Sequence, residues 1–144
     1  MTSGDTLSIC LRYFTALNER DWDGLDAILG RNVVFGVVPY GIQIRGALQV
    51  VAGSRMQGTE LPDFHTEVIN SFAAGDACMV ETVTSYSLTA PWNPGIRGVE
   101  VIAASGRRVS REGCFIFVLR GGRIMRITHY HDRLTVVRQL SGAD

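Results

Sequence analysis

The pattern of apolar and polar positions predicts helices in the first part of the chain. Over residues 3–29 apolar side chains recur at steps of three and four, with one break at "NERDWD", which indicates two helices with one apolar face each. Ser3 or Asp5 can cap the first helix by accepting from free backbone N–H groups, and Gly30 can end the second. Residues 47–57 predict a third, weaker helix, since they include valines and a glycine.

Runs rich in β-branched and aromatic residues then predict strands. Two hairpins are expected, with Gly75 and Asp76 at the first turn and Gly121 and Gly122 at the second, because these residues suit tight turns. The Pro- and Gly-rich residues 91–106 between the hairpins are long enough to form a lid or an irregular edge. The strand segments are residues 32–38, 63–90 and 107–132; residues 39–46 are expected to be an exposed connection and residues 133–140 one or two helical turns.

Helices followed by antiparallel strands predict the α+β class. A strongly curved sheet wrapped around the N-terminal helices would form a cone with an apolar interior. With 144 residues, 46% of them hydrophobic and 19% charged, the chain is expected to form a single globular domain over residues 1–144. Repeats and low-complexity tracts are absent from the sequence.

Charge, hydropathy and cysteine content limit the binding partners and the location that we expect. The formal net charge is zero and no basic stripe alternates with aromatic residues, so nucleic acid is not an expected partner. No cationic and apolar leader and no apolar run of ~18 residues is present, so we expect no membrane partner and a cytoplasmic location. The three isolated cysteines, Cys10, Cys78 and Cys114, are expected to be small buried hydrophobes. A cluster of arginines is expected at solvated edges of the sheet: Arg107, Arg108, Arg111, Arg120, Arg123 and Arg126.

Several phrases resemble the SnoaL-like polyketide cyclase family of the NTF2-like superfamily. They are "LPDFHTEV", "AAGDACMVETVTSYSL", "SGRRVSREGCFIFVLRGGRI" and "HYHDRLTVVRQL", and the resemblance covers nearly the whole chain. It implies a cone-shaped, NTF2-like fold that also serves ketosteroid isomerases and limonene epoxide hydrolases. Because one fold serves many chemistries, the residues must decide the function.

Asp132 falls where the resemblance places the acid/base aspartate of the cyclases. A carboxyl group facing an apolar cavity would lose hydration, so its pKa would rise toward neutrality and suit proton transfer. The alternative is a helix N-cap, since Asp132 directly precedes "RLTVV" and aspartate is favoured at that position for stability alone.

Alternation along the last strand places Tyr130 on the face of Asp132, with His129 and His131 on the other face. The two histidines are therefore not expected to bind a metal with Asp132, and no third ligand stands at a suitable spacing. They are expected on the sheet face that meets a second subunit in a homodimer, unless a β-bulge reverses the alternation.

Thr82, Thr84 and Tyr86 alternate on a neighbouring strand. Their hydroxyls could bind substrate oxygens on an apolar wall, or they could reflect ordinary β-propensity. In the epoxide hydrolases the resemblance implies an arginine and an aspartate two apart on this strand; here Thr82 and Thr84 stand in those places, which disfavours epoxide opening.

Other candidates depart from the family pattern. Phe115 stands where some cyclases place a histidine, and His65 is a possible substitute on the first long strand. Tyr13 could imitate the tyrosine of ketosteroid isomerases, but no carboxylate follows Phe35 to act as their base. That branch is therefore disfavoured.

Aromatic residues are candidates for the substrate surface. Trp92 in the expected lid could stack on a flat polycyclic ligand or plug the mouth of the cone, and Tyr40 could lie at the pocket lip or on the surface. Phe35, Phe115 and Phe117 would supply apolar contact at ~25 cal/mol per Å² buried.

Together these features favour a cofactor-independent enzyme of secondary metabolism that acts on a hydrophobic, polyketide-like small molecule by cyclisation or isomerisation. Asp132 is the expected proton carrier, with Tyr86, Thr84 and Tyr130 orienting substrate oxygens. The alternatives are a non-catalytic ligand-binding or dimerisation module and an epoxide hydrolase or hydratase.

Overall fold

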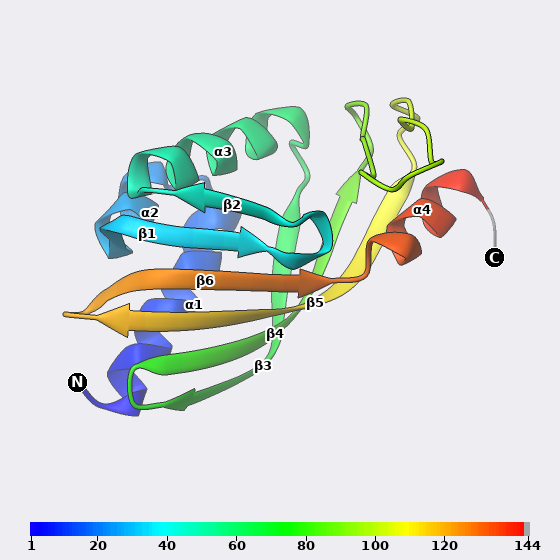
Figure 1. Cartoon of the computed structure of the whole chain (residues 1–144). Helices are drawn as coiled ribbons and strands as arrows, with labels where there is room; N and C mark the ends of the chain where they lie inside the picture. The colour runs from blue at the N-terminus through cyan, green and yellow to red at the C-terminus, as the bar shows by residue number, and fades with distance from the viewer. Residues whose placement is uncertain (143–144) are drawn as a thin grey trace.

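The computed structural model describes residues 1–142 and has four α-helices, a short 3-10 helix and six strands (Figure 1). The predicted α+β class and the curved sheet are confirmed. In chain order the elements are α1 (Ser3–Glu19), α2 (Trp22–Ile28), β1 (Leu29–Val37), η1 (Val38–Tyr40), β2 (Ile42–Arg45), α3 (Ala47–Glu60), β3 (His65–Ala74), β4 (Ala77–Ser87), β5 (Arg108–Arg120), β6 (Arg123–His131) and α4 (Arg133–Ser141).

The residues at the ends of the first two helices differ from the prediction. Thr2, rather than Ser3 or Asp5, caps α1, and Asp5 completes a capping box by accepting from the Thr2 backbone N–H at 3.0 Å. The α2 helix ends at Ile28 and the chain passes directly into β1, so Gly30 lies in a strand and does not end the helix.

The six strands form one mixed sheet in the order β2-β1-β6-β5-β4-β3. The β1–β6 pair is parallel and the other pairs are antiparallel. The two predicted hairpins form as β3–β4 and β5–β6, with positive φ at Gly75, Gly121 and Gly122. The expected connection over residues 39–46 instead contains β2, which pairs with β1 at the edge of the sheet.

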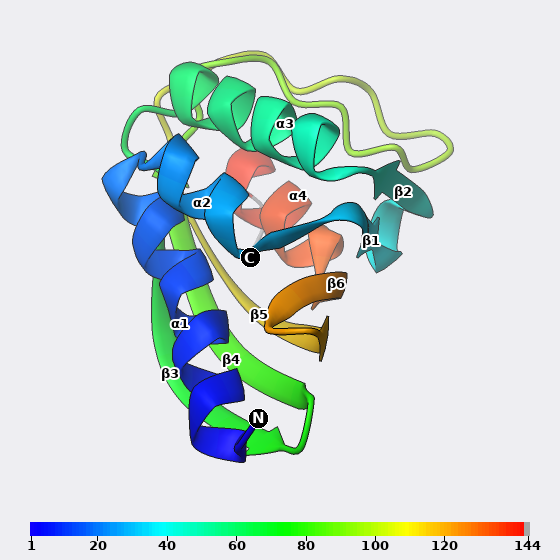
Figure 2. The same ribbon diagram turned by 90° about the vertical axis from the view of Figure 1, so that its left-hand side faces the viewer.

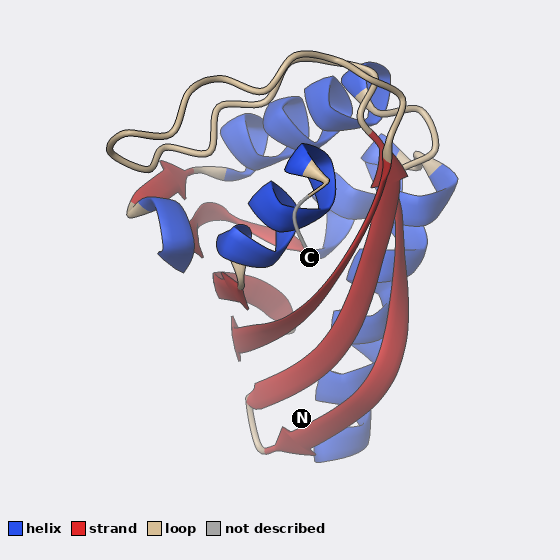
Figure 3. Ribbon diagram, turned by 90° about the vertical axis from the view of Figure 1, so that its right-hand side faces the viewer, coloured by secondary structure: helices blue, strands red, loops and turns tan. Residues whose placement is uncertain are grey.

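The sheet curves strongly and has its N-terminal helices on the concave side. Figure 2 shows α1 alongside β3 and β4, with α2 and α3 above it, and Figure 3 shows α4 at the far end of the curved strands. Tyr13 and Phe14 of α1 contact Phe115 and Phe117 of β5, with ring centres 5.0–6.1 Å apart. These contacts bury the apolar face that the three- and four-residue spacing predicts.

The segment between β4 and β5 forms a strap across the end of the cone (Figure 2). Its base is closed by backbone hydrogen bonds of Leu88 with Ser105 and Arg107, and its middle by an antiparallel bridge between Trp92 and Ile102. Thr89 also donates to the Glu60 carbonyl oxygen at 2.6 Å. The predicted lid is therefore hydrogen bonded to itself and to the end of α3.

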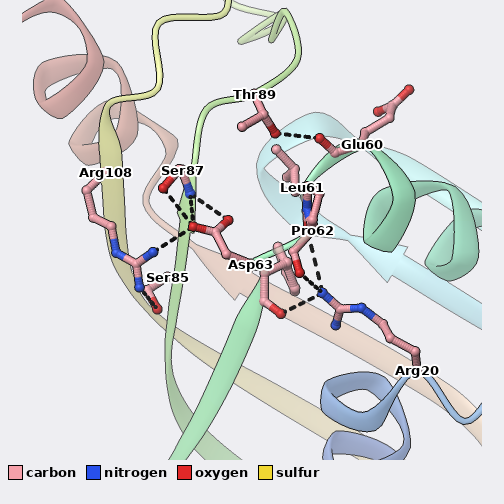
Figure 4. A network of polar contacts seen from close by, with 10 residues as sticks. Arg20, Glu60, Leu61, Pro62, Asp63, Ser85, Ser87, Thr89 and Arg108 are labelled. Atoms are coloured by element: carbon pink, nitrogen blue, oxygen red, sulfur yellow. Dashed lines mark hydrogen bonds and ion pairs between the residues drawn. The ribbon is translucent and has the colours of Figure 1, made fainter.

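A polar network holds the turn between α3 and β3 (Figure 4). The Asp63 carboxylate accepts from the Ser87 hydroxyl at 2.7 Å and from the Arg108 guanidinium at 2.8 Å. Arg20 donates to the carbonyl oxygens of Pro62 and Phe64, both at 3.0 Å. This network fixes the start of β3, and with it the Phe64 ring at the cavity.

The three cysteines are free; Cys10 and Cys78 are buried, as predicted, and Cys114 is half-buried. Within residues 1–142, no helix has the length and apolar character needed to cross a membrane.

Candidate active site

A cavity of about 380 Å³ opens between the concave face of the sheet, α3 and the strap. Its wall is mostly apolar, and α1, β1, β2, α3 and the start of β3 all contribute to it. The volume lies in the range of small-molecule sites. The apolar lining includes Leu17, Phe35, Ile44, Val50, Met56 and Phe64.

One part of the wall is polar, where β5 and β6 lie side by side. Arg111, His129 and His131 line the cavity there. Arg111 Nε, His129 Nε2 and both ring nitrogens of His131 are buried without a hydrogen-bond partner in the described chain, as is Thr82 Oγ1 beneath them. We call these four residues the inner polar cluster. Unpaired buried polar atoms are rare in native proteins, and their concentration at one cavity makes it the candidate functional site.

Gly113 makes room for the inner polar cluster. It pairs with Thr82 on one side and with His131 on the other, on the same face as Arg111. A Cβ atom at this position would lie 3.1 Å from His129 Nε2, 3.3 Å from Thr82 Oγ1 and 3.2 Å from the Tyr130 carbonyl oxygen. The missing side chain therefore leaves a notch between the polar groups.

Burial keeps both histidines neutral. It is the main cause that lowers the pKa of His129 to about 2 and that of His131 to about 3, and the positive charge of Arg111 lowers both further. The His129 ring stacks on Phe115 with centres 3.8 Å apart, while His131 lies 4.7 Å from His129 and 5.6 Å from the Tyr40 ring. Near pH 7 both imidazoles are therefore neutral, and each can accept one hydrogen bond and donate another.

Arg111 gives the cavity its charge. Its side chain is only 9% exposed, and no ion pair to it is present within residues 1–142. No aspartate or glutamate is among the residues that line the cavity. Burial lowers the pKa of Arg111, but a guanidinium remains protonated in proteins. The prediction that Arg111 belongs to a solvated edge is wrong.

Two tyrosines complete the polar wall. Burial raises the pKa of both Tyr40 and Tyr86, so their hydroxyls remain protonated and can donate hydrogen bonds. The Arg111 guanidinium lies 5.8 Å from the centre of the Tyr86 ring, and the Arg133 guanidinium lies 5.5 Å from that of Tyr40. Arg133 also donates to the Pro94 carbonyl at 3.3 Å, which links Tyr40 to the strap.

Asp132 lies outside this cavity. It is the exposed N-cap of α4 and accepts from the Leu134 N–H at 2.9 Å and the Thr135 hydroxyl at 2.9 Å. These hydrogen bonds, that of Thr135 first, lower its pKa. The predicted position in an apolar cavity and the predicted raised pKa are wrong, and the N-cap alternative describes the residue.

The alternation predicted for the last strand occurs, but the histidine face is the inner one. His129 and His131 line the cavity, whereas Tyr130 is 45% exposed on the outer face and cannot orient a ligand inside. His65 is exposed at the start of β3, opposite Ser85, and is also outside. The predicted substrate contacts of Tyr130 and His65 are therefore wrong.

Of the other predicted substrate-binding residues, some line the cavity and some lie in the core. Phe35, Tyr40, Thr84, Tyr86, Trp92 and Phe115 line the cavity. The Thr84 hydroxyl is 3.0 Å from the Thr66 hydroxyl, so it already has a partner. Thr82 and Phe117 are fully buried behind the cavity wall and are not among its lining residues.

The sequence contains a signal for the inner polar cluster. Arg111 has the same parity as the apolar residues Val109, Phe115 and Phe117 of its strand, and His129 has that of Ile127. A charged or polar residue on the apolar face of a strand must either find a partner or serve a site. Groups of three or more His, Cys, Asp or Glu side chains that could hold a metal ion are absent from the described residues.

Comparison with known proteins agrees with this architecture. Residues 11–127 match the family model described as SnoaL-like domain. A provisionally assigned SnoaL-like polyketide cyclase from Jannaschia sp. CCS1 superposes with a TM-score of 0.82 at 18% identity, over 96% of this chain and 93% of that chain. An LEH-like epoxide hydrolase of M. tuberculosis gives a TM-score of 0.76 at 21% identity, over 98% and 92% of the two chains.

TsrD from Streptomyces laurentii gives a TM-score of 0.79 at 24% identity, over 100% of this chain and 99% of that chain. No curated protein sequence matches the chain. At these identities the structural likeness shows the fold alone.

Proposed function

The chain belongs to the SnoaL-like domain family, and on that premise we propose that it is a cofactor-independent enzyme that moves protons on a small hydrophobic molecule. Its substrate would be polyketide-like or otherwise polycyclic, and the reaction a cyclisation or an isomerisation. The observation that carries the proposal is the inner polar cluster, of which Arg111, His129 and His131 line an otherwise apolar cavity and have unpartnered polar atoms.

His131 is the proposed proton carrier in place of Asp132. Both of its ring nitrogens are buried without a partner, and it lines the cavity beside Arg111. A neutral imidazole can take a proton from a carbon next to a carbonyl group, and Arg111 can stabilise negative charge on the substrate. The charge of Arg111 is one cause of the low pKa of His131, so negative charge on the substrate makes His131 more basic.

The proton balance requires no further reactant. In an isomerisation the proton leaves one carbon for His131 and returns to another carbon of the same molecule. In a cyclisation the enolate carbon forms a bond to a second carbonyl carbon, and the resulting alkoxide takes the proton back from His131. Tyr40 and Tyr86 would donate hydrogen bonds to substrate oxygens, and Phe35, Phe115 and Trp92 would contact its rings.

A proton-exchange assay tests this proposal without knowledge of the natural substrate. The enolisable bicyclic ketone 2-tetralone is incubated in D₂O, and loss of its α-proton signal is followed by NMR. We expect the protein to accelerate exchange and His131→Gln to lower the acceleration by ~10²–10⁴. His65→Gln, at an exposed histidine, and Asp132→Asn are the matched controls and should retain it. Full acceleration in His131→Gln would overturn the assignment.

A non-catalytic ligand-binding module is the second candidate. The pKa of about 3 for His131 favours it, because so weak a base transfers protons slowly unless the ligand changes its surroundings. This candidate predicts retention of a ligand with no acceleration of exchange in the same assay. The epoxide hydrolase alternative is less well supported, since no carboxylate lines the cavity to activate water.

We also propose that the chain forms a homodimer through the outer face of the sheet. Phe72, Met79, Ile116, Val118 and Tyr130 of β3–β6 are exposed on that face. Contiguous exposed apolar side chains mark interaction surfaces. Sedimentation of the wild type as a dimer, and of Ile116→Glu as a monomer, is the expected result.

A further inference from the structure

Arg111 places a permanent positive charge in a wall that offers it no acidic partner. The side chain lines the cavity at 9% exposure, and the cavity lining contains no carboxylate. Burying an unpaired charge is unfavourable for folding. A group of opposite charge that enters the cavity would remove this penalty, so the arrangement favours an anionic ligand.

The shape of the guanidinium narrows the type of anion. It is planar, and its Nε has no hydrogen-bond partner in residues 1–142. Two neighbouring N–H groups of a guanidinium match the two oxygens of a carboxylate, which they bind through two parallel hydrogen bonds. One positive charge also suits a monoanion better than a phosphate, which carries nearly two charges.

The groups around Arg111 do not oppose an anion. The two histidines beside it are neutral, and the hydroxyls of Tyr40 and Tyr86 can donate. Beyond them the wall is aromatic, with Phe35, Phe115 and Trp92.

We infer that the ligand of this cavity is a small aromatic or polycyclic carboxylic acid, bound as its anion with the carboxylate on the guanidinium of Arg111. The inference rests on the proposed function and deepens it by naming the substrate class. A bound carboxylate would neutralise Arg111 and thereby raise the proton affinity of His131.

The test measures binding alone. Isothermal titration calorimetry is performed with 2-naphthoate and with the neutral, nearly isosteric 2-naphthamide. We expect the wild type to prefer the carboxylate, and Arg111→Met to weaken its binding about 10- to 100-fold while leaving the amide unchanged. Arg120→Met removes an exposed arginine of the same strand that does not line the cavity, and it should leave both affinities unchanged. Thermal unfolding establishes that each variant is folded.

Two further arms complete the experiment. 4-Nitrobenzoate and 4-nitrophenol are compared at a pH where the phenol is fully ionised, and the carboxylate should bind more tightly. Equal affinity for naphthoate and naphthamide, unchanged naphthoate binding in Arg111→Met, no naphthoate binding at millimolar concentration, or tighter binding of the phenolate would each overturn the inference. Turnover plays no part in these measurements, so failure of the proton-transfer proposal would leave this result standing.

Discussion

Arg108 and Arg111 lie three residues apart on β5 and have opposite surroundings. Arg108 is exposed and forms an ion pair with Asp63 at 2.8 Å, within the network of Figure 4. Arg111 is buried in the cavity wall and has no ion pair within the described part of the chain. The surface arginine therefore has the partner that it needs least, because water already solvates it. The buried arginine lacks a partner of opposite charge, which is the reason that we propose an anionic ligand for it.

The largest expected effect is the pH dependence of the free energy of unfolding that His129 and His131 cause. Because the pKa values of His129 and His131, about 2 and about 3, lie below the value of 6.5 for the unfolded chain, the unfolded state binds more protons in between. Stability is then fully present above about pH 6.5 and falls as the pH decreases toward about 3, by at most about 1.4 kcal/mol per pH unit for His129 and by less for the half-buried His131, whose charge solvent partly screens.

Urea unfolding at a series of pH values measures this slope. His129→Gln should remove at least half of it in the range where both histidines contribute. A stability that stays constant from neutral pH down to about pH 4 would contradict the buried, neutral state of the pair.

Exchanging the two arginines for methionine tests the comparison directly. Arg111→Met should raise the free energy of unfolding by about 1–4 kcal/mol, because it replaces an unpaired buried charge by apolar volume. Arg108→Met should lower it by about 0–1 kcal/mol, as expected for an exposed ion pair. Chemical denaturation of both variants gives the two values, and a destabilised Arg111→Met would mean that Arg111 serves the fold.

Filling the notch at Gly113 should have a slightly smaller effect. Gly113→Val brings side-chain atoms against His129, Thr82 and the Tyr130 carbonyl, so it should cost about 1–3 kcal/mol and block the inner polar cluster. Gly36→Ala is the control on another strand, since a Cβ there would meet only the Ile127 carbonyl oxygen, at 4.0 Å, and Gly36 does not line the cavity. Thermal unfolding and the naphthoate titration together measure both consequences.

The smallest effect is expected at the end of the last strand. Asp132→Ala removes the N-cap of α4 and should lower the unfolding temperature by a few degrees, whereas Asp132→Asn keeps a capping oxygen and should change it less. Neither should change proton exchange on 2-tetralone. Loss of exchange in both variants with unchanged stability would return the catalytic role to Asp132.

The sequence predicted the fold better than the site, for a physical reason. Helical periodicity around Leu11 and Phe14, and turn residues such as Gly75 and Gly121, act locally, so they can be recognised without knowledge of the fold. Which face of a strand is inside depends on the whole sheet. The alternation of His129 and Asp132 was recognisable, but only the assembled cone shows that the histidines face inward and that Asp132 caps a helix.

The parallel pairing of β1 with β6 has a consequence for the order of folding. Val34 lies beside Arg126 and Phe35 beside Ile127, so β1, which pairs with β2 on one edge, finds its second neighbour only after most of the polypeptide exists. During synthesis on the ribosome, one edge of β1 would stay unpaired until β6 has been made. Pairing between strands so distant in the sequence makes folding slow. Chaperone dependence during synthesis, and failure of shortened chains that lack β6, are what this arrangement implies.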